Sequence, residues 1–199
     1  MIRLYGTPLS HFTRKIRILL LELELAVEFI DIGNVGDNNI EIFQNNPLMR
    51  VPILEDGNHK IFESDNIARY IVDKYDPEDQ FRVKNCEPQV LNILSVISGV
   101  MEAEVKLILA ERGGMNDIYQ HHFFQKARDV VINGLNWLSQ QEKLTERDCL
   151  CYQHIVCVCM WDHLDRYGLF DLSPYQSLQL LCNKWNQRPS FAETYPGGH

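Results

Sequence analysis

The stretch from residue 46 to residue 75 constrains the fold most strongly, because it predicts strand, turn, strand and helix in close succession. Two short apolar runs, residues 53–54 and 60–62, lie on either side of Asp56 and Gly57. These two residues tolerate the positive φ that a tight β-hairpin turn requires. The stretch therefore predicts an antiparallel hairpin that leads directly into a helix.

A possible binding edge begins where the first of these strands starts. Pro52 has no N–H, so it is expected at an edge or as the first residue of a strand. If the Val51–Pro52 peptide bond is cis, Val51 directs its N–H and C=O outward, where an extended peptide can pair with them. The Glu63-Ser64 step lies beside a helix N-terminus, capped by Ser64 or Asp65, which favours a carboxylate. Glutathione combines a peptide backbone with such a charged end.

These residues resemble a known family. Val51-Pro52, the hairpin and Glu63-Ser64 with Ile67 three residues further on are similar to the glutathione-binding half of cytosolic glutathione S-transferases. The resemblance covers nearly all of residues 1–195. It implies an α/β plus all-α fold, in which a thioredoxin-like βαβαββα domain is followed by an all-helical C-terminal domain.

The residues before the hairpin are consistent with a thioredoxin-like domain. We expect a strand at 3–5, a helix over about 11–23, a strand at 27–32, a loop at 33–39 and a short helix at 40–44. Two strands joined by a helix form a parallel pair with a right-handed crossover. On the helix over 11–23, apolar residues recur on one side, while charged residues that include Arg14 and Lys15 occupy the other.

The residues after the hairpin are predicted to be helical. We expect domains at 1–76 and 86–199, joined by a linker at 77–85. The expected helices cover about 88–111, 118–140, 145–165 and 175–187. Thr145 and Asp148 are spaced as a capping box that would open the third of these helices. A similar box starts the central helix of the second domain in glutathione S-transferases, and the end of the chain, 188–191, also resembles that family.

Ser10 is the candidate catalytic residue. A thiol like that of glutathione has a pKa of about 8.5, and lowering it by two units needs roughly 2.7 kcal/mol of preference for the thiolate. A hydroxyl donor beside a helix N-terminus can supply much of this. The motif Gly6-x-Pro8-x-Ser10-x-Phe12-x-Arg14-Lys15 resembles that of bacterial serine-type enzymes, which implies a Ser10 contact with sulfur. Thr7 and Thr13 are rivals, and Ser10 could instead only cap the helix.

The other candidate glutathione contacts are Val51, Pro52, Glu63, Ser64 and Arg50. Arg50 is interpreted either as a partner of a glutathione carboxylate or as a solvated side chain, with neither interpretation favoured. Asp65 could face the ligand amine, including one bound to the neighbouring subunit of a dimer, or could stabilise the helix start, and the second interpretation is preferred. The seven histidines show no ligand spacing, so no metal site is predicted.

Composition excludes several other classes of protein. The net charge is −8. Residues 1–76 contain 8 basic and 12 acidic residues, and the rest of the chain contains 11 basic and 15 acidic residues. Without a basic half, binding to nucleic acid has little electrostatic support. The start of the chain does not resemble a signal peptide, and no apolar run is long enough to cross a bilayer. We therefore expect a cytoplasmic protein that does not bind membranes, with its six cysteines as buried, reduced thiols.

The predicted function is conjugation of the glutathione thiolate to a small, soft electrophile, and the resemblance implies a homodimer. The leading alternative is a non-catalytic interaction protein of the stringent starvation protein A type, which resembles these transferases but binds RNA polymerase. A third possibility is a glutathione-dependent reductase, peroxidase or isomerase. No cysteine occurs in the first 85 residues, which weighs against reduction through a protein–glutathione disulfide.

Overall fold

The structure, a computed structural model, describes residues 1–36, 38–145 and 149–196. Its contacts divide the chain into two compact units, the first made of residues 1–84 with the segment from Trp185 onward and the second of residues 85–184. The sequence assigned the C-terminal segment to the second domain, 86–199, whereas its contacts group it with the first unit. Among the described helices, none is both long and apolar enough to span a membrane.

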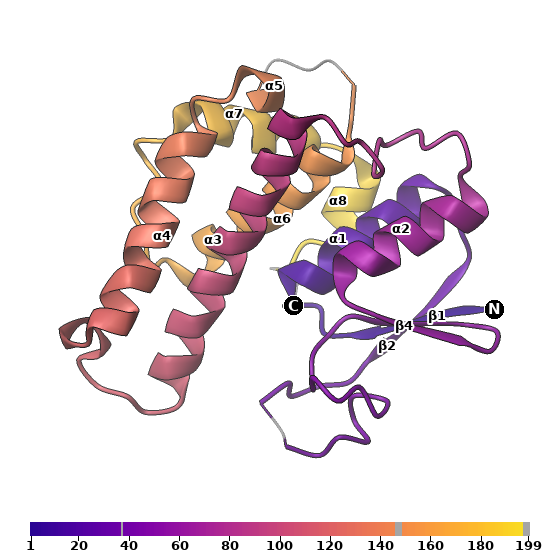
Figure 1. Cartoon of the computed structure of the whole chain (residues 1–199), viewed down its shortest axis with the longest axis horizontal. Coiled ribbons are helices and arrows are strands. Elements are labelled where there is room, and N and C mark those ends of the chain that lie inside the picture. Colours follow the sequence, from indigo (N-terminus) through magenta and orange to yellow (C-terminus); the bar gives the residue numbers. More distant parts are fainter. Residues whose placement is uncertain (37, 146–148, 197–199) are drawn as a thin grey trace. The chain divides into compact units, whose positions relative to one another are not determined.

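The first unit contains a four-stranded mixed sheet with helices (Figure 1). Its elements are β1 (Ile2–Gly6), α1 (His11–Glu22), β2 (Val27–Asp31), β3 (Ile53–Asp56), β4 (His59–Phe62), α2 (Ser64–Tyr75) and, after the second unit, α8 (Pro189–Glu193). The strand order is β2-β1-β3-β4, with β1 parallel to β2 and antiparallel to β3. The predicted parallel pair, hairpin and thioredoxin-like class are therefore confirmed.

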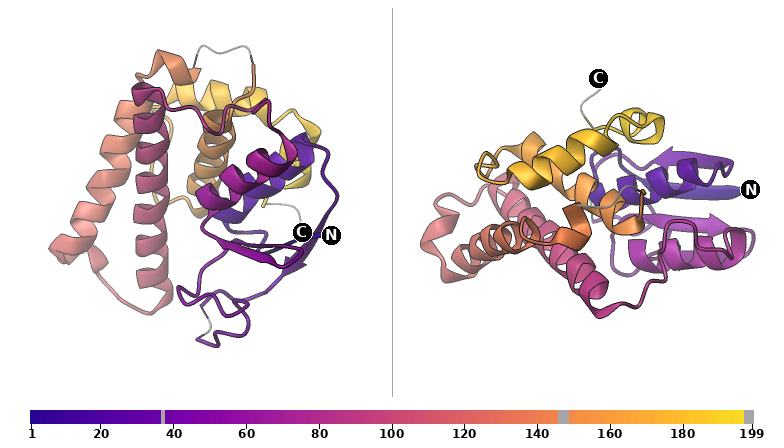
Figure 2. Two further views of the ribbon diagram at one scale, coloured as in Figure 1. Left: turned by 45° about the vertical axis from the view of Figure 1, so that its right-hand side comes forward. Right: turned by 90° about the horizontal axis from the view of Figure 1, so that it is seen from above.

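Alternation along the strands gives the sheet two apolar faces. Tyr5 and Ile53 are paired across β1 and β3, and they form a buried cluster with Phe43 on one face. Leu4 and Leu54, their neighbours in sequence, are also paired and fully buried, and they point to the opposite face. Helices α1 and α2 lie side by side over that second face, while the segment between β2 and β3 lies on the other (Figures 1 and 2).

The short helix predicted at 40–44 is instead a run of tight turns. The N–H groups of Phe43 and Gln44 donate to the C=O groups of Ile40 and Glu41, three residues back, at 3.1 and 3.0 Å. Gln44 and Asn45 then adopt positive φ values of 52° and 59°, which no α-helix can accommodate. The turns still bury the Phe43 side chain completely, so this segment covers the sheet without being a helix.

The second unit is entirely helical in its described residues. Its elements are α3 (Pro88–Arg112), the 3₁₀-helix η1 (Ile118–Gln120), α4 (His122–Leu138), α5 (Glu142–Thr145), α6 (Tyr152–Tyr167) and α7 (Gln176–Trp185), whose last residue belongs to the first unit. Helix α3 packs against α4 and α6. A Cβ at Gly134 of α4 would lie 2.3 Å from Val100 Cγ2 of α3, so glycine permits this close approach. Residues 152–164 of α6 are all buried, as its apolar pattern predicted.

The cysteines lie within the second unit, and four of the six are buried as expected. Cys86 and Cys149 are exposed instead. Both precede a helix in the described structure rather than lying within one. The prediction of buried thiols therefore holds for the cysteines of α6 and α7 and for Cys151, and is wrong for these two.

Helix α6 starts later than the sequence predicted. It begins at Tyr152 instead of at Thr145, which ends α5. Asp148, the other half of the predicted capping box, lies outside the described residues. The cap is formed instead by Cys151, whose N–H donates to His154 Nδ1 at 3.0 Å. An imidazole nitrogen thus takes the place of the expected carboxylate, because Thr145 is still part of the preceding helix.

The hairpin is joined to α2 by one carboxylate with three donors. Asp56 Oδ2 accepts hydrogen bonds from Lys74 Nζ and Tyr75 OH, each at 2.5 Å, and from Tyr70 OH at 3.0 Å. Burial alone would raise the pKa of Asp56, but the hydrogen bonds from Lys74, Tyr75 and Tyr70 outweigh it and lower the pKa from 3.8 to about 2. The ionised carboxylate therefore stabilises the folded first unit.

This cluster predicts a specific loss of stability in acid. Because the folded pKa of Asp56 is below its unfolded value, its contribution is complete above about pH 4 and disappears as the pH falls to about 2. We expect Asp56→Asn to lower the free energy of unfolding by about 1–2 kcal/mol at neutral pH. Chemical denaturation as a function of pH should show the difference from the unmodified chain vanish toward pH 2.

Asp73→Asn is the matched control, because Asp73 pairs with Lys84 at 3.0 Å but its side chain is 65% exposed. Exposed pairs contribute little, so this variant should follow the unmodified chain at every pH. An Asp56→Asn difference that stays constant between pH 6 and about pH 2 would contradict the assignment.

Candidate functional site

Strand pairing brings the predicted site segments to one end of the sheet in the first unit. Tyr5 near the end of β1 is paired with Ile53 at the start of β3, which is paired with Phe62 at the end of β4. The chain leaves β1 toward residues 7–10, enters β3 from residues 50–52 and leaves β4 toward residues 63–64. All three segments therefore lie at the same end of the sheet, where α1 and α2 both begin (Figure 1).

The segment before β3 presents an unpaired piece of backbone. The Val51–Pro52 peptide bond is cis, as the sequence analysis considered. Val51 is half-buried, and neither its N–H nor its C=O forms a hydrogen bond with any described residue. Arg50 is exposed and forms no ion pair within the described part of the chain. The structure thus leaves at Val51 a donor and an acceptor that an extended peptide could use.

Asn46 holds this segment in place, and the sequence analysis assigned it no role. Its side chain is fully buried, with Nδ2 donating to the Arg50 C=O at 3.0 Å and Oδ1 accepting from the Leu48 N–H at 3.0 Å. An asparagine four residues before a carbonyl can bridge the turn between them. The position of Asn46 directly before Pro47 was the available signal, because such dipeptides favour turns.

Ser10 caps α1 and keeps its hydroxyl hydrogen available. Its Oγ accepts a hydrogen bond from the Thr13 N–H at 3.2 Å, and its own N–H donates to the Thr7 C=O at 3.1 Å. The side chain is half-buried, and its O–H has no acceptor among the residues that the structure describes. Ser10 therefore satisfies the helix as an acceptor and can still donate to a ligand atom.

The two rival hydroxyls are less suitable. Thr13 is fully buried, and its side chain lies against the end of β1, where a Cβ on Gly6 would be 2.4 Å from Thr13 Cγ2. Thr7 is also buried, with 8% of its surface exposed. Of the three hydroxyl residues considered from sequence, Ser10 is thus the most accessible.

The N-terminus of α2 has no side-chain cap within the described chain, and the same is true of α3 and α4. The N-cap residue is Glu63, whereas Ser64 or Asp65 was predicted, and Ser64 is the first helical residue and is buried. Glu63 has φ 65° and ψ 128°, a conformation that non-glycine residues rarely adopt. The amides of Ser64 and Asn66, in the first turn, therefore remain available to an external anion.

Arg14 and Lys15, on the side of α1 that the apolar pattern left to charged residues, are both buried. Lys15 Nζ donates to Asp65 Oδ1 at 2.7 Å, which connects α1 with the first turn of α2. Arg14 donates to the C=O of Phe191 at 3.2 Å and to Thr194 Oγ1 at 3.3 Å. Periodicity assigned both residues to a polar face because it cannot detect partners that are distant in sequence.

The far end of α1 is fixed to the C-terminal segment by a carboxylate. Glu22 accepts from Arg188 Nε and Nη2 at 2.8 and 2.6 Å and also from the Ser190 hydroxyl. Burial favours a raised pKa for Glu22, but the hydrogen bonds from Arg188 and Ser190 prevail and lower it. Together with the Arg14 contacts, this arrangement fixes both ends of the helix that carries Ser10.

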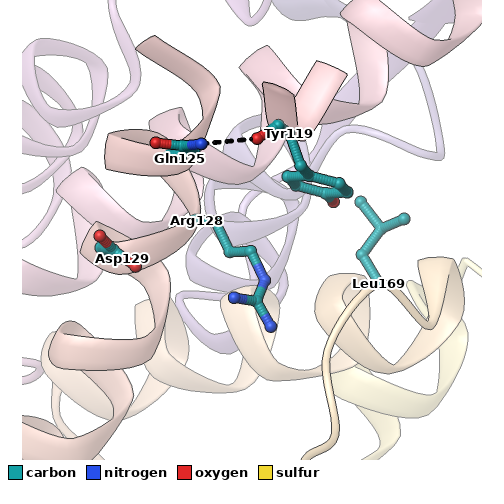
Figure 3. Close-up of a pocket in the computed structure, with 5 residues that line it drawn as sticks. All are labelled: Tyr119, Gln125, Arg128, Asp129 and Leu169. Atoms are coloured by element: carbon teal, nitrogen blue, oxygen red, sulfur yellow. Dashed lines mark hydrogen bonds between the residues drawn. The ribbon is translucent and has the colours of Figure 1, made fainter. Parts of the chain in front are cut away.

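A hollow of about 630 Å³ lies in the second unit and is separate from this site. Figure 3 shows Arg128 between Asp129 on one side and Tyr119 with Leu169 on the other. The Gln125 amide donates to the Tyr119 C=O at 2.8 Å. None of the residues predicted from sequence to bind a ligand lines this hollow.

Comparison with known proteins identifies the type of the first domain. The family model for the glutathione S-transferase N-terminal domain matches residues 4–79. A glutathione S-transferase of Silene vulgaris is 36% identical over 81 residues, which are 40% of this chain and 37% of that protein. Arabidopsis thaliana glutathione S-transferase F7 is 41% identical over 76 residues, 37% of this chain and 36% of the relative. The matched stretch is thus little more than a third of the length of these relatives.

Solved structures resemble the chain over nearly its whole length. A glutathione S-transferase from Methylobacillus flagellatus with GSH bound has a TM-score of 0.83, is 21% identical, and the match covers 98% of this chain and 100% of that one. A glutathione S-transferase from Methylobacterium radiotolerans in complex with glutathione sulfonate has a TM-score of 0.82 and is 20% identical. That match covers 100% of this chain and 96% of the other. The whole chain therefore has the fold of these glutathione S-transferases, and the family model identifies residues 4–79 as a domain of the glutathione S-transferase N-terminal type.

The contact between β1 and α1 predicts a strict size limit at Gly6. A methyl group there would lie 2.4 and 2.5 Å from the Thr13 side chain, so Gly6→Ala must push α1 away from the sheet. We expect the free energy of unfolding to fall by about 1–3 kcal/mol, measured by denaturant titration. Adding Thr13→Ala should restore part of the loss, because it removes the two closest atoms. Gly99→Ala is the control, since open space surrounds that position and stability should not fall.

Proposed function

We propose that this chain, whose first domain is of the glutathione S-transferase N-terminal type, binds glutathione at the described end of the sheet and joins it through its sulfur to a small electrophile. The proposal rests on two sets of backbone hydrogen-bonding groups that lie at the same end of the sheet and have no partner among the described residues. These are the open backbone of Val51 and the uncapped first turn of α2. Solved structures of the same fold with bound GSH or glutathione sulfonate support this choice of ligand.

The proposed binding mode uses both features. The N–H and C=O of Val51 pair with the cysteinyl unit of the ligand as an added strand would, and Pro52 shapes this edge. The amides at the start of α2, with the Ser64 side chain, hold the carboxylate of the γ-glutamyl unit, and Glu63 accepts from its ammonium group. In this proposal the exposed Arg50 pairs with the carboxylate at the glycine end.

The proposed chemistry assigns Ser10 the role of thiolate stabiliser. Its O–H donates to the sulfur, so the thiol loses its proton to solvent more readily than the ordinary pKa of about 8.5 allows. The thiolate electron pair then forms a C–S bond to an electrophilic carbon. In a substitution, the leaving group departs with its bonding pair; in an addition, the product carbanion takes a proton from water. Ser10 is a hydrogen-bond donor here and does not act as the base.

Isothermal titration with glutathione tests the ligand directly. We expect a dissociation constant of about 1 mM or tighter, as for a peptide held by backbone pairing and one charged end. A chain that binds no glutathione at millimolar concentration would exclude transferase, peroxidase and isomerase activity alike. That result would leave the non-catalytic interaction protein as the function of this fold.

Ser10 variants test the catalytic assignment. Ser10→Ala removes the donor, so the pKa of bound glutathione should rise toward about 8.5, as followed by the ultraviolet absorbance of the thiolate. The loss of the cap should also lower stability by about 1 kcal/mol. Ser10→Thr keeps both functions of the hydroxyl and should resemble the unmodified chain. Thr7→Ala is the matched control, and Ser10→Ala with an unchanged thiol pKa would remove Ser10 from this role.

We also propose that the protein acts as a cytoplasmic homodimer, as its superfamily resemblance implies. Size-exclusion chromatography with light scattering should give twice the chain mass of 23.2 kDa. A mass equal to that of one chain, at all concentrations tested, would contradict the dimer while leaving the glutathione site of the first unit open to test.

A further inference from the structure

Lys15 is a fully buried cation close to the proposed ligand site. It lies on the second turn of α1, and none of its side chain is exposed. A buried ammonium group is costly unless it is paired with a carboxylate. Its Nζ donates to Asp65 Oδ1 at 2.7 Å, and Asp65 belongs to the first turn of α2. The ion pair therefore joins the second turn of α1 to the first turn of α2, and both helices begin at the site.

The two partners of this ion pair are not equivalent. The Asp65 side chain is 59% exposed, so water could solvate its carboxylate without help from Lys15. Lys15 has no such alternative, because it is buried. The ion pair therefore reduces the negative charge that the exposed Asp65 carboxylate presents at the start of α2.

That charge lies where the proposed ligand carboxylate would bind. Asp65 follows Ser64 directly, and an acidic side chain in the first turn competes with an external anion for the positive end of the helix. Glu63 adds a second carboxylate one residue before Ser64. If Lys15 did not neutralise Asp65, two negative charges would repel a ligand carboxylate from the same amides.

We propose that Lys15 is a positioning residue that neutralises Asp65, so that the first turn of α2 can accept the α-carboxylate of the γ-glutamyl unit. This inference rests on the proposed function and names the part of the ligand that Lys15 affects. Lys15 acts through Asp65 and need not touch the ligand. Of Lys15, Asp65 and Glu63, only Glu63 then presents an uncompensated negative charge, which attracts the ligand ammonium group.

A purely structural ion pair would behave differently from this electrostatic device. If the pair only held α1 and α2 together, removing either partner would weaken ligand binding in the same way. In the electrostatic case the two partners have opposite effects, because losing Lys15 leaves a negative charge and losing Asp65 removes one. The sign of each single change therefore separates the two roles.

The experiment is isothermal titration of the whole chain with two ligands. One is glutathione, and the other is its analogue in which the α-carboxylate of the γ-glutamyl unit is an amide. The variants are Lys15→Met, which replaces the buried ammonium with an apolar chain of similar length, Asp65→Asn, and the double variant. Lys84→Met is the matched control, because Lys84 pairs with Asp73 at 3.0 Å in the same unit and its side chain is partly exposed.

We expect Lys15→Met to weaken glutathione binding by about tenfold, as one uncompensated charge near a ligand carboxylate would, and to leave binding of the amide analogue within about twofold. Asp65→Asn should bind glutathione at least as tightly as the unmodified chain. The double variant should recover most of the loss seen with Lys15→Met, and Lys84→Met should change neither affinity. If Lys15→Met does not fold, Asp65→Asn and the double variant decide the question.

Three results would overturn the inference. They are an equal loss of affinity for both ligands in Lys15→Met, a loss of glutathione affinity in Asp65→Asn, or no recovery in the double variant. Each of these can occur while the unmodified chain binds glutathione normally, so each rejects the role of Lys15 alone. An unmodified chain that binds neither ligand would instead reject the proposed function, and this inference with it.

Discussion

Pairing of β3 with both β1 and β4 is the constraint on which the candidate site depends. The register aligns Tyr5, Ile53 and Phe62, so that β1 ends, β3 begins and β4 ends at the same end of the sheet. Loops that are more than 50 residues apart in sequence, near Ser10 and Ser64, are brought together by this register without needing contacts of their own. Backbone hydrogen bonds thus determine where the polar groups lie, and the loops only decide which groups those are.

Much of this arrangement was predictable because its signals are local. The Asp56-Gly57 turn, the apolar runs beside it and the alternation of β2 specify a hairpin and a parallel pair from short stretches of sequence. The proposed site segments were predictable for the same reason, since each lies directly before or after such an element. The capping of α1 by Ser10 likewise follows from residues three positions apart.

The differences arise where distant residues determine the outcome. The burial of Arg14 and Lys15 has no local signal, because their partners, near Phe191 and at Asp65, are remote in sequence. The segment around Phe43 has helical composition, but it is folded into turns that direct one aromatic side chain onto the sheet. The positive φ of Glu63 has no local signal in the sequence, because glutamate rarely adopts it. The periodicity of apolar residues indicates which side of a strand or helix is buried. It does not indicate which distant residues that side will contact.

The attachment of the C-terminal segment to α1 has a consequence for how the protein is made. Arg14 and Glu22 find their partners at residues 188–194, at the other end of the chain from α1. Domains emerging from the ribosome generally fold in the order of their synthesis. Here α1 carries two charged side chains whose partners follow 166 to 177 residues later in the sequence. The first unit therefore stays incomplete until residues 188–194 have been synthesised.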